Sequence, residues 1–166
     1  MHIGSDVINK NSKTYFIAEI GLNFDGSFER ALKLIDLAKV CGADAVKFQH
    51  YTADSLVSDK GFKKIGENMG HQKGWSGSVF EVYEKASLNK EWTKELKEYT
   101  KMKGLGFLTS PYSKKLIDFT SEYLDAIKIG SGDITWTEII EYASKTQKPI
   151  LLGTGASNFE DVDNAV

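Results

Sequence analysis

Five short, mostly apolar segments recur along the chain, and each is followed by a longer and more polar stretch. Continuous apolar runs of this length are typical of parallel strands that are covered on both faces. The predicted strands are Tyr15–Gly21, Ala45–Gln49, Gly106–Ser110, Ala126–Gly130 and Ile150–Gly153.

Apolar residues at helical spacing lie between these strands and after the last one. The predicted helices lie behind Ser27, around Trp92–Tyr99, behind Ser113, around Trp136–Ala143 and behind Ser157. Gly104 is placed to end the second helix, and Ser157 to Glu160 form a capping-box pattern that opens the fifth. The segment from His50 to about Gly77 has no periodicity, so we expect a long functional or mobile loop there.

This alternation of strands and helices predicts a parallel α/β fold. Two architectures remain open, a doubly wound sheet and a (β/α)8 barrel. A barrel needs about 250 residues for its eight units, whereas this chain has 166 residues and five units. As a barrel, the chain is therefore expected to be truncated at Val166, inside its fifth helix. Its open edges would then favour self-association, with Ala18, Ala45 and Leu152 as interior positions.

Three charged residues interrupt the predicted strands, namely Glu19, Lys47 and Lys128. Because side chains alternate along a strand, both lysines point away from their branched and aromatic neighbours, toward the interior of a barrel. A buried charge is costly unless it is paired or faces a ligand. One interpretation is that Glu19 pairs with one lysine and no ligand binds. The other lysine then has no carboxylate partner, and a bound anion would compensate its positive charge.

Hydroxyls and glycines follow the strands at the end where these charges converge. Ser110 closes the third strand, Ser131 follows the fourth, and Gly153–Ser157 follows the fifth. Such turns present backbone N–H groups to phosphate, but any tight turn between a strand and a helix also needs small residues. The histidines, His2, His50 and His71, lack metal-binding spacing.

Composition narrows the classes of function. The formal net charge of −2 argues against a nucleic-acid partner bound through bulk positive charge. No apolar run approaches the roughly 18 residues of a membrane span, and the first residues lack the apolar core of a signal peptide. The single cysteine, Cys41, excludes an intrachain disulfide. We therefore expect a cytoplasmic protein with neither nucleic-acid nor membrane partners.

Five stretches, taken in order, resemble the N-terminal half of the sialic acid (N-acetylneuraminate) synthase family. They are Ala18–Asn23 (AEIGLN), Val46–Gln49 (VKFQ), Thr109–Ser113 (TSPYS), Lys128–Asp133 (KIGSGD) and Gly153–Gly155 (GTG). The resemblance covers nearly the whole chain. It implies a (β/α)8 TIM-type barrel, of which residues 1–166 cover roughly the first five β/α units. The remaining strands and an antifreeze-like C-terminal domain are expected beyond residue 166.

The resemblance also implies an activity. Family members are transferases that condense phosphoenolpyruvate with an N-acetylated amino sugar, such as N-acetylmannosamine or a related deoxy sugar. The product is a sialic-acid-like nonulosonic acid, and phosphate is released by C–O cleavage. Glu19 matches a catalytic carboxylate that contacts the sugar near its reacting carbonyl. The positions that match phosphoenolpyruvate binding are Lys47, Ser110, Lys128 and Ser131. Further candidates for binding are Asn23, Gln49 and Thr154.

Two further features of the family fall outside this chain. The resemblance implies a divalent metal, Mn²⁺ or Mg²⁺, whose ligands lie beyond residue 166, with no metal ligand in residues 1–166. It also implies a homodimer. Two positions depart from the family pattern: Phe24 replaces a usual histidine, and Gly153 replaces a frequent serine, so that one phosphate-facing hydroxyl is missing. The segment around His71–Trp75 differs as well, which leaves the acceptor sugar open.

Two other functions remain as alternatives. One is a Schiff-base aldolase in which Lys128 or Lys47 is the nucleophile. The other is a non-catalytic half-barrel that binds phosphorylated metabolites. We also expect the isolated 166-residue chain to be inactive while it keeps affinity for phosphoenolpyruvate or phosphate.

Overall fold

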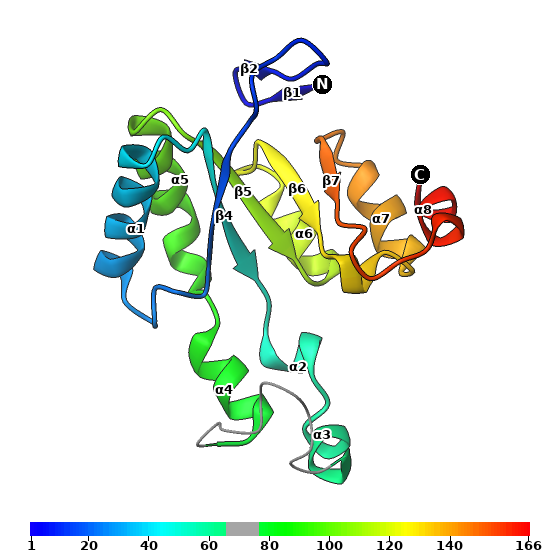
Figure 1. The fold of residues 1–166 in the computed structure, drawn as a ribbon. Helices are drawn as coiled ribbons and strands as arrows, with labels where there is room; N and C mark the ends of the chain where they lie inside the picture. The colour runs from blue at the N-terminus through cyan, green and yellow to red at the C-terminus, as the bar shows by residue number, and fades with distance from the viewer. Residues whose placement is uncertain (66–76) are drawn as a thin grey trace.

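A five-stranded parallel sheet forms the centre of the computed structural model, which describes residues 1–65 and 77–166 (Figure 1). Its strands are β3 (Ile17–Gly21), β4 (Ala45–His50), β5 (Gly106–Pro111), β6 (Ala126–Ile129) and β7 (Ile150–Leu152). Each strand lies beside the next one in the sequence, without the reversal of a doubly wound sheet. The five predicted strands are confirmed, with ends that differ by one or two residues.

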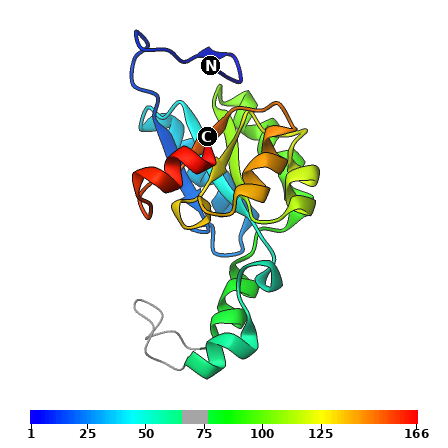
Figure 2. The same cartoon turned by 90° about the vertical axis from the view of Figure 1, so that its right-hand side faces the viewer.

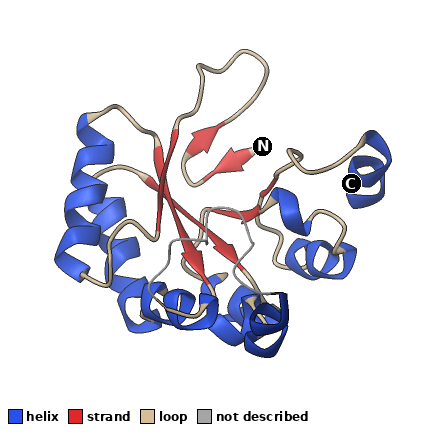
Figure 3. Ribbon diagram, turned by 60° about the horizontal axis from the view of Figure 1, so that its bottom comes forward, coloured by secondary structure: helices blue, strands red, loops and turns tan. Residues whose placement is uncertain are grey.

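Helices follow these strands where the sequence predicts them, and they cover the outer face of the sheet (Figure 3). They are α1 (Phe28–Val40), α5 (Thr93–Met102), α6 (Lys114–Thr120), α7 (Thr137–Ser144) and α8 (Phe159–Ala165), with short 3-10 turns η2 (Lys90–Trp92) and η3 (Ser131–Asp133). Ser27 and Ser113 cap α1 and α6 by accepting backbone N–H groups of the first turn. Gly104, with a φ of +68°, lies just past the end of α5, as predicted.

The predicted capping box of the last helix is wrong by one residue. The side chain of Asn158, not that of Ser157, accepts the N–H of Asp161 at 2.9 Å, and the carboxylate of Asp161 accepts the N–H of Asn158 at 2.9 Å. The hydroxyl of Ser157 instead donates to the carbonyl of Thr154 at 2.7 Å. Ser157 and Asn158 are both suitable capping residues. Because the Ser157 hydroxyl is bonded within the turn after β7, Asn158 caps the helix.

The prediction of one long loop from His50 to Gly77 is also wrong for part of that segment. It contains two short helices, α2 (Ala53–Leu56) and α3 (Asp59–Ile65), and α4 (Val79–Ala86) follows it. These helices project beyond the carboxyl ends of the strands (Figure 2). Helices α2 and α3 are too short to show a 3.6-residue period. Residues 66–76, which include His71 and Trp75, lie outside the described residues.

A small antiparallel hairpin, which the sequence did not predict, opens the chain. Its strands are β1 (His2–Ile3) and β2 (Asp6–Val7), with His2 opposite Val7. The hairpin lies at the amino-terminal end of the sheet (Figure 1). There Ile3, only 2% exposed, packs with Ala45, Leu108 and Ala126 on the inner face. Ala45 is therefore buried within the chain, and the prediction that it would otherwise face water is wrong.

Two other predicted interior positions lie on the opposite face. Ala18 pairs in register with Val46, and Leu152 pairs with Ile129, so both contact the larger core between the sheet and the helices. The true inner positions are their neighbours Ile17 and Leu151, which pack with the inner cluster. An error of one residue in assigning a strand exchanges its two faces completely.

Candidate active site

The carboxylate of Glu19 and the ammonium of Lys47 form an ion pair at the inner face of the sheet. Parallel pairing of β3 with β4 places the two residues opposite each other, and Lys47 Nζ lies 2.7 Å from Glu19 Oε2. Lys47 is buried, whereas the side chain of Glu19 is 52% exposed to solvent. Lys47 Nζ also donates to Ser110 Oγ at 3.3 Å and to the carbonyl of Phe48 at 3.5 Å. The sequence predicts that the three charges Glu19, Lys47 and Lys128 converge; the first two are in direct contact, and both act electrostatically on the third.

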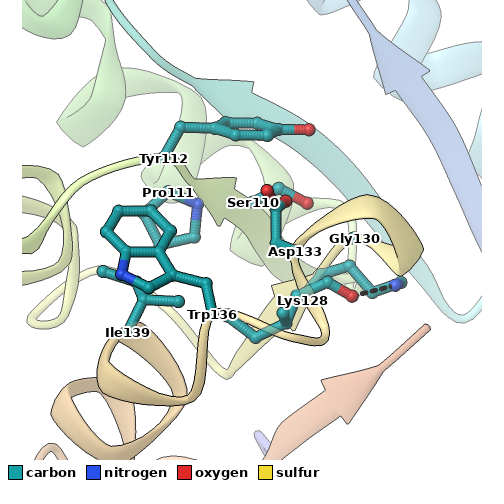
Figure 4. A pocket seen from close by; sticks show the side chains of 9 residues that line it. Ser110, Pro111, Tyr112, Lys128, Gly130, Asp133, Trp136 and Ile139 are labelled. Carbon is teal, nitrogen blue, oxygen red and sulfur yellow. Dashed lines mark hydrogen bonds between the residues drawn. The ribbon is translucent and has the colours of Figure 1, made fainter. Parts of the chain in front are cut away.

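Lys128 is the second cation of this face, on strand β6. Its ammonium donates to the carbonyl of its own neighbour Ile129 and has no carboxylate partner among the described residues (Figure 4). Burial lowers the pKa of Lys128, and the charge of Lys47 lowers it further, while Glu19 and Asp133 act in the opposite direction. The ion pair therefore neutralises Lys47 and, within residues 1–65 and 77–166, leaves Lys128 as a positive charge without a carboxylate partner.

A small pocket opens beside Lys128, between the carboxyl ends of β5 and β6 and the start of α7 (Figure 4). Its polar lining comes from Ser110, Tyr112, Lys128 and Asp133, and the indole of Trp136 closes one side. Burial raises the pKa of Asp133, although the ammonium of Lys128 opposes that rise. Burial, together with the nearby Asp133 and Glu19 carboxylates, raises the pKa of Tyr112 to about 12, so its hydroxyl is a neutral donor.

Among the polar and aromatic residues of this pocket, Tyr112, Asp133 and Trp136 received no role in the sequence interpretation. Each lies one to seven positions after a strand, in a turn whose path the hydrophobic pattern does not determine. The available signal was their position next to the strand ends, because functional side chains of parallel barrels gather there.

The remaining candidate residues differ in how closely they approach the site. Gln49 and Glu19 both approach Gly21. A Cβ built on Gly21 would lie 3.1 Å from Glu19 Oε1 and 3.8 Å from Gln49 Nε2, so the two side chains lie close to each other. Ser131 opens the turn after β6 and lies next to Gly153. Asn23 and Thr154 are exposed, and neither side chain forms a hydrogen bond within the described part of the chain.

The aromatic residue that departs from the family pattern does not reach the site. Phe24 is fully buried on the outer face, where its ring lies 6.3 Å from that of Trp92 and 6.4 Å from that of Phe48. Its effect is therefore on the packing between the sheet and the η2 turn that precedes α5, and the pocket contains no part of it.

His50 is likewise a residue of the outer core. Its imidazole is 1% exposed and bridges the hydroxyls of Thr109 and Thr93, with Nδ1 2.8 Å and Nε2 2.9 Å from the two oxygens. Burial lowers the pKa of His50 to about 4, and Lys90 adds to that effect. Among residues 1–65 and 77–166, no three His, Cys, Asp or Glu side chains are arranged to hold a metal ion.

This burial predicts a pH dependence of stability. The unfolded chain binds a proton at His50 near pH 6.5, whereas the folded chain resists protonation until about pH 4. Stability is therefore complete above pH 6.5 and falls as the pH drops toward 4, with a slope approaching about 1.4 kcal/mol per pH unit. Urea unfolding between pH 4 and 7 would measure it. His50→Gln should remove this part of the slope and His2→Gln, at an exposed position, should keep it; equal slopes in all three proteins would contradict the prediction.

The fold and the site together define a class of protein. A parallel sheet with an inner face that carries two lysines, one carboxylate and strand-end hydroxyls is typical of part of a (β/α)8 barrel, in which functional side chains gather at the carboxyl ends of the strands. The family model described as the NeuB family matches residues 34–166, and the chain belongs to that family. The family resemblance seen in the five sequence stretches is thereby confirmed.

Individual relatives agree with this assignment. The chain is 34% identical to a pseudaminic acid synthase of Campylobacter jejuni, over 98% of this chain and 46% of the relative. It is also 34% identical to an N,N'-diacetyllegionaminic acid synthase of the same species, over 93% of this chain and 46% of the relative. The chain thus spans about half the length of the curated relatives that it matches.

A solved structure extends the comparison to the fold. The N-acetylneuraminic acid synthetase of Leptospira borgpetersenii, solved with citrate, superposes with a TM-score of 0.81 at 26% identity, covering 99% of this chain and 53% of that one. The five β/α units are therefore the N-terminal part of a TIM-type barrel, as predicted. Within the described residues, no helix is both long and apolar enough to cross a membrane.

Proposed function

We propose that the complete protein, the gene product that carries this chain, condenses phosphoenolpyruvate with an N-acetylated amino sugar to form a nonulosonic acid. The observation that carries this proposal is the unequal pairing of the two inner lysines. Glu19 neutralises Lys47, whereas Lys128 has no carboxylate partner among the described residues. An anionic substrate restores the balance of charge, and both phosphate and carboxylate are suited to ammonium and hydroxyl donors.

The residues of the site divide into two groups by the substrate they would bind. Lys47, Ser110, Lys128 and Ser131 would hold the phosphate and carboxylate of phosphoenolpyruvate. Their positive charge also stabilises the charge that develops during the reaction. Glu19 is more exposed than its partner Lys47. Its carboxylate can therefore accept hydrogen bonds from the second substrate, the sugar, and orient that sugar for attack.

The proposed reaction then proceeds by formation of a C–C bond. C3 of phosphoenolpyruvate attacks the aldehyde carbon of the open-chain sugar, whose oxygen takes up a proton. Water adds to C2, and the resulting tetrahedral intermediate loses phosphate through cleavage of the C2–O bond, leaving a ketone at C2. One proton of the water goes to the sugar oxygen and the other leaves with the phosphate, so the atoms balance.

The other properties implied by the family remain predictions. The described residues include no metal-binding cluster. That the complete protein uses Mn²⁺ or Mg²⁺, bound by residues beyond 166, is expected from the family resemblance. Assembly as a homodimer and a cytoplasmic location are expected on the same basis. The relatives named above differ in their products, so the acceptor is proposed only as an N-acetylated amino sugar.

Isotope labelling tests the reaction. The complete protein is incubated with Mn²⁺ or Mg²⁺, a panel of N-acetylated hexoses and phosphoenolpyruvate that carries ¹⁸O in the oxygen between C2 and phosphorus. We expect phosphate release to depend on one acceptor and the released phosphate to retain the ¹⁸O. Phosphate without the label would contradict C–O cleavage, and no release with any acceptor would contradict the proposal as a whole.

A second candidate function, a Schiff-base aldolase, is favoured by one observation. Burial and the charge of Lys47 lower the pKa of Lys128, which increases the fraction of free amine. Borohydride reduction in the presence of pyruvate separates the two functions, because an imine on Lys128 or Lys47 would become a stable adduct that mass spectrometry detects. The condensation proposed above requires no such adduct, and finding one with turnover loss would favour the aldolase.

A further inference from the structure

Gly153 lies directly against the ammonium of Lys128. It follows β7, and its N–H donates to the carbonyl of Ile129 at 2.9 Å, the same carbonyl that accepts the Lys128 ammonium. A Cβ built on Gly153 would lie 2.7 Å from Lys128 Nζ, 2.9 Å from Ser131 N and 3.2 Å from the Ile129 oxygen. The first two distances are shorter than carbon can approach nitrogen, so a side chain here could be accommodated only if these atoms moved.

We propose that in this chain Gly153, which stands where the family often has serine, is a positioning residue: the Lys128 ammonium lies in the space that a side chain would fill, and this seat holds it for its anionic substrate. The inference rests on the proposed function only in naming phosphoenolpyruvate as that anion. The seat itself is defined by Gly153 on one side and the Ile129 carbonyl on the other.

The chemistry of the seat explains why such an arrangement is useful. A carbonyl oxygen fixes the ammonium without neutralising it, whereas a carboxylate, such as the one that holds Lys47, cancels the charge. The charged groups whose fields reach Lys128 are Lys47, Glu19 and Asp133. Lys128 therefore lies in a defined position with its positive charge still available, which is what a preorganised anion site requires.

Adding a methyl group tests the seat. Phosphoenolpyruvate is titrated by calorimetry into the complete wild-type protein, Gly153→Ala, Lys128→Met and the double variant. We expect Gly153→Ala to weaken binding about tenfold, as for loss of one charged hydrogen bond, and to have less than about a twofold effect when Lys128 is already Met. Wild-type affinity in Gly153→Ala, or an undiminished effect of that change in the Lys128→Met background, would overturn the proposal.

A matched control and a charge-preserving variant sharpen the result. Gly155→Ala lies two residues further on, and its Cβ would meet Ser131 Oγ at an ordinary 3.8 Å, so its affinity should stay within about twofold of wild type. Lys128→Arg keeps the charge, but the guanidinium is too large for the seat, and we expect it to weaken binding also. Retained affinity in Lys128→Arg would overturn the proposal even if Gly153→Ala fails to fold.

A second measurement separates the seat from the proposed function. Trace labelling with acetic anhydride, read by mass spectrometry, reports the reactivity of each lysine. We expect Gly153→Ala to change the reactivity of Lys128 at least about threefold while the exposed Lys13 stays constant. If the wild type binds no phosphoenolpyruvate but Lys128 responds in this way, the proposed function fails and the seat stands. If Lys128 does not respond, the seat fails.

Discussion

Replacing Lys47 by Met is expected to lower kcat/KM for phosphoenolpyruvate by about 10²–10³-fold or more in the complete protein, as when a preorganised charged donor is lost. Lys47 is the buried donor that connects Glu19 with Ser110, so the substitution removes a charge and releases both partners. The fold should survive, because Met has a similar length and apolar stem, and because the Glu19 carboxylate left behind is half exposed and can be hydrated. Steady-state phosphate release would measure the loss.

Lys13 provides the control for this experiment. It forms an ion pair of the same 2.7 Å length, with Asp44, but its side chain is 82% exposed and lies before β3, at the other end of the sheet. Lys13→Met should leave kcat/KM within about twofold of wild type, since exposed ion pairs contribute little. If both substitutions reduce activity equally, or if Lys47→Met retains wild-type activity, Lys47 is not part of the anion site.

Much of the sheet could be predicted from sequence because its strands are buried on both faces. Such strands are continuous apolar runs, and a lysine within one of them is conspicuous. The alternation of side chains along a strand then correctly predicted that Lys47 and Phe48 lie on opposite faces of the sheet. The same rule failed for Ala18 and Leu152, because small or uniformly apolar strands do not show which side faces the helices.

The parts that the sequence did not predict depend on contacts between distant segments. The β1–β2 hairpin has strands of only two residues, and Ile3 is buried only because Ala45, Leu108 and Ala126 surround it. In the same way, alternation predicts that Lys128 points inward, but not that its ammonium turns back to the Ile129 carbonyl. That position depends on Gly153, which is 25 residues away in the sequence.

Replacing Ile3 by Ala is expected to destabilise the folded protein by about 2–5 kcal/mol, the range for truncating a buried isoleucine. Ile3 is 2% exposed and fills the amino-terminal end of the inner face, beneath the layer that contains Lys47. Its loss leaves a cavity bordered by the rigid strands β4, β5 and β6, which cannot collapse easily because hydrogen bonds fix their spacing.

The hairpin itself supplies the control for this prediction. Val7 lies on the partner strand of the same hairpin and is 54% exposed, so Val7→Ala should change stability by no more than about 0.5 kcal/mol. Urea unfolding of both variants, compared at equal m-values, measures the two effects. If Ile3→Ala and Val7→Ala were equally mild, the hairpin would not seal the inner core. If only Ile3→Ala lowers the midpoint, the first residues of the chain are part of the core that supports the site.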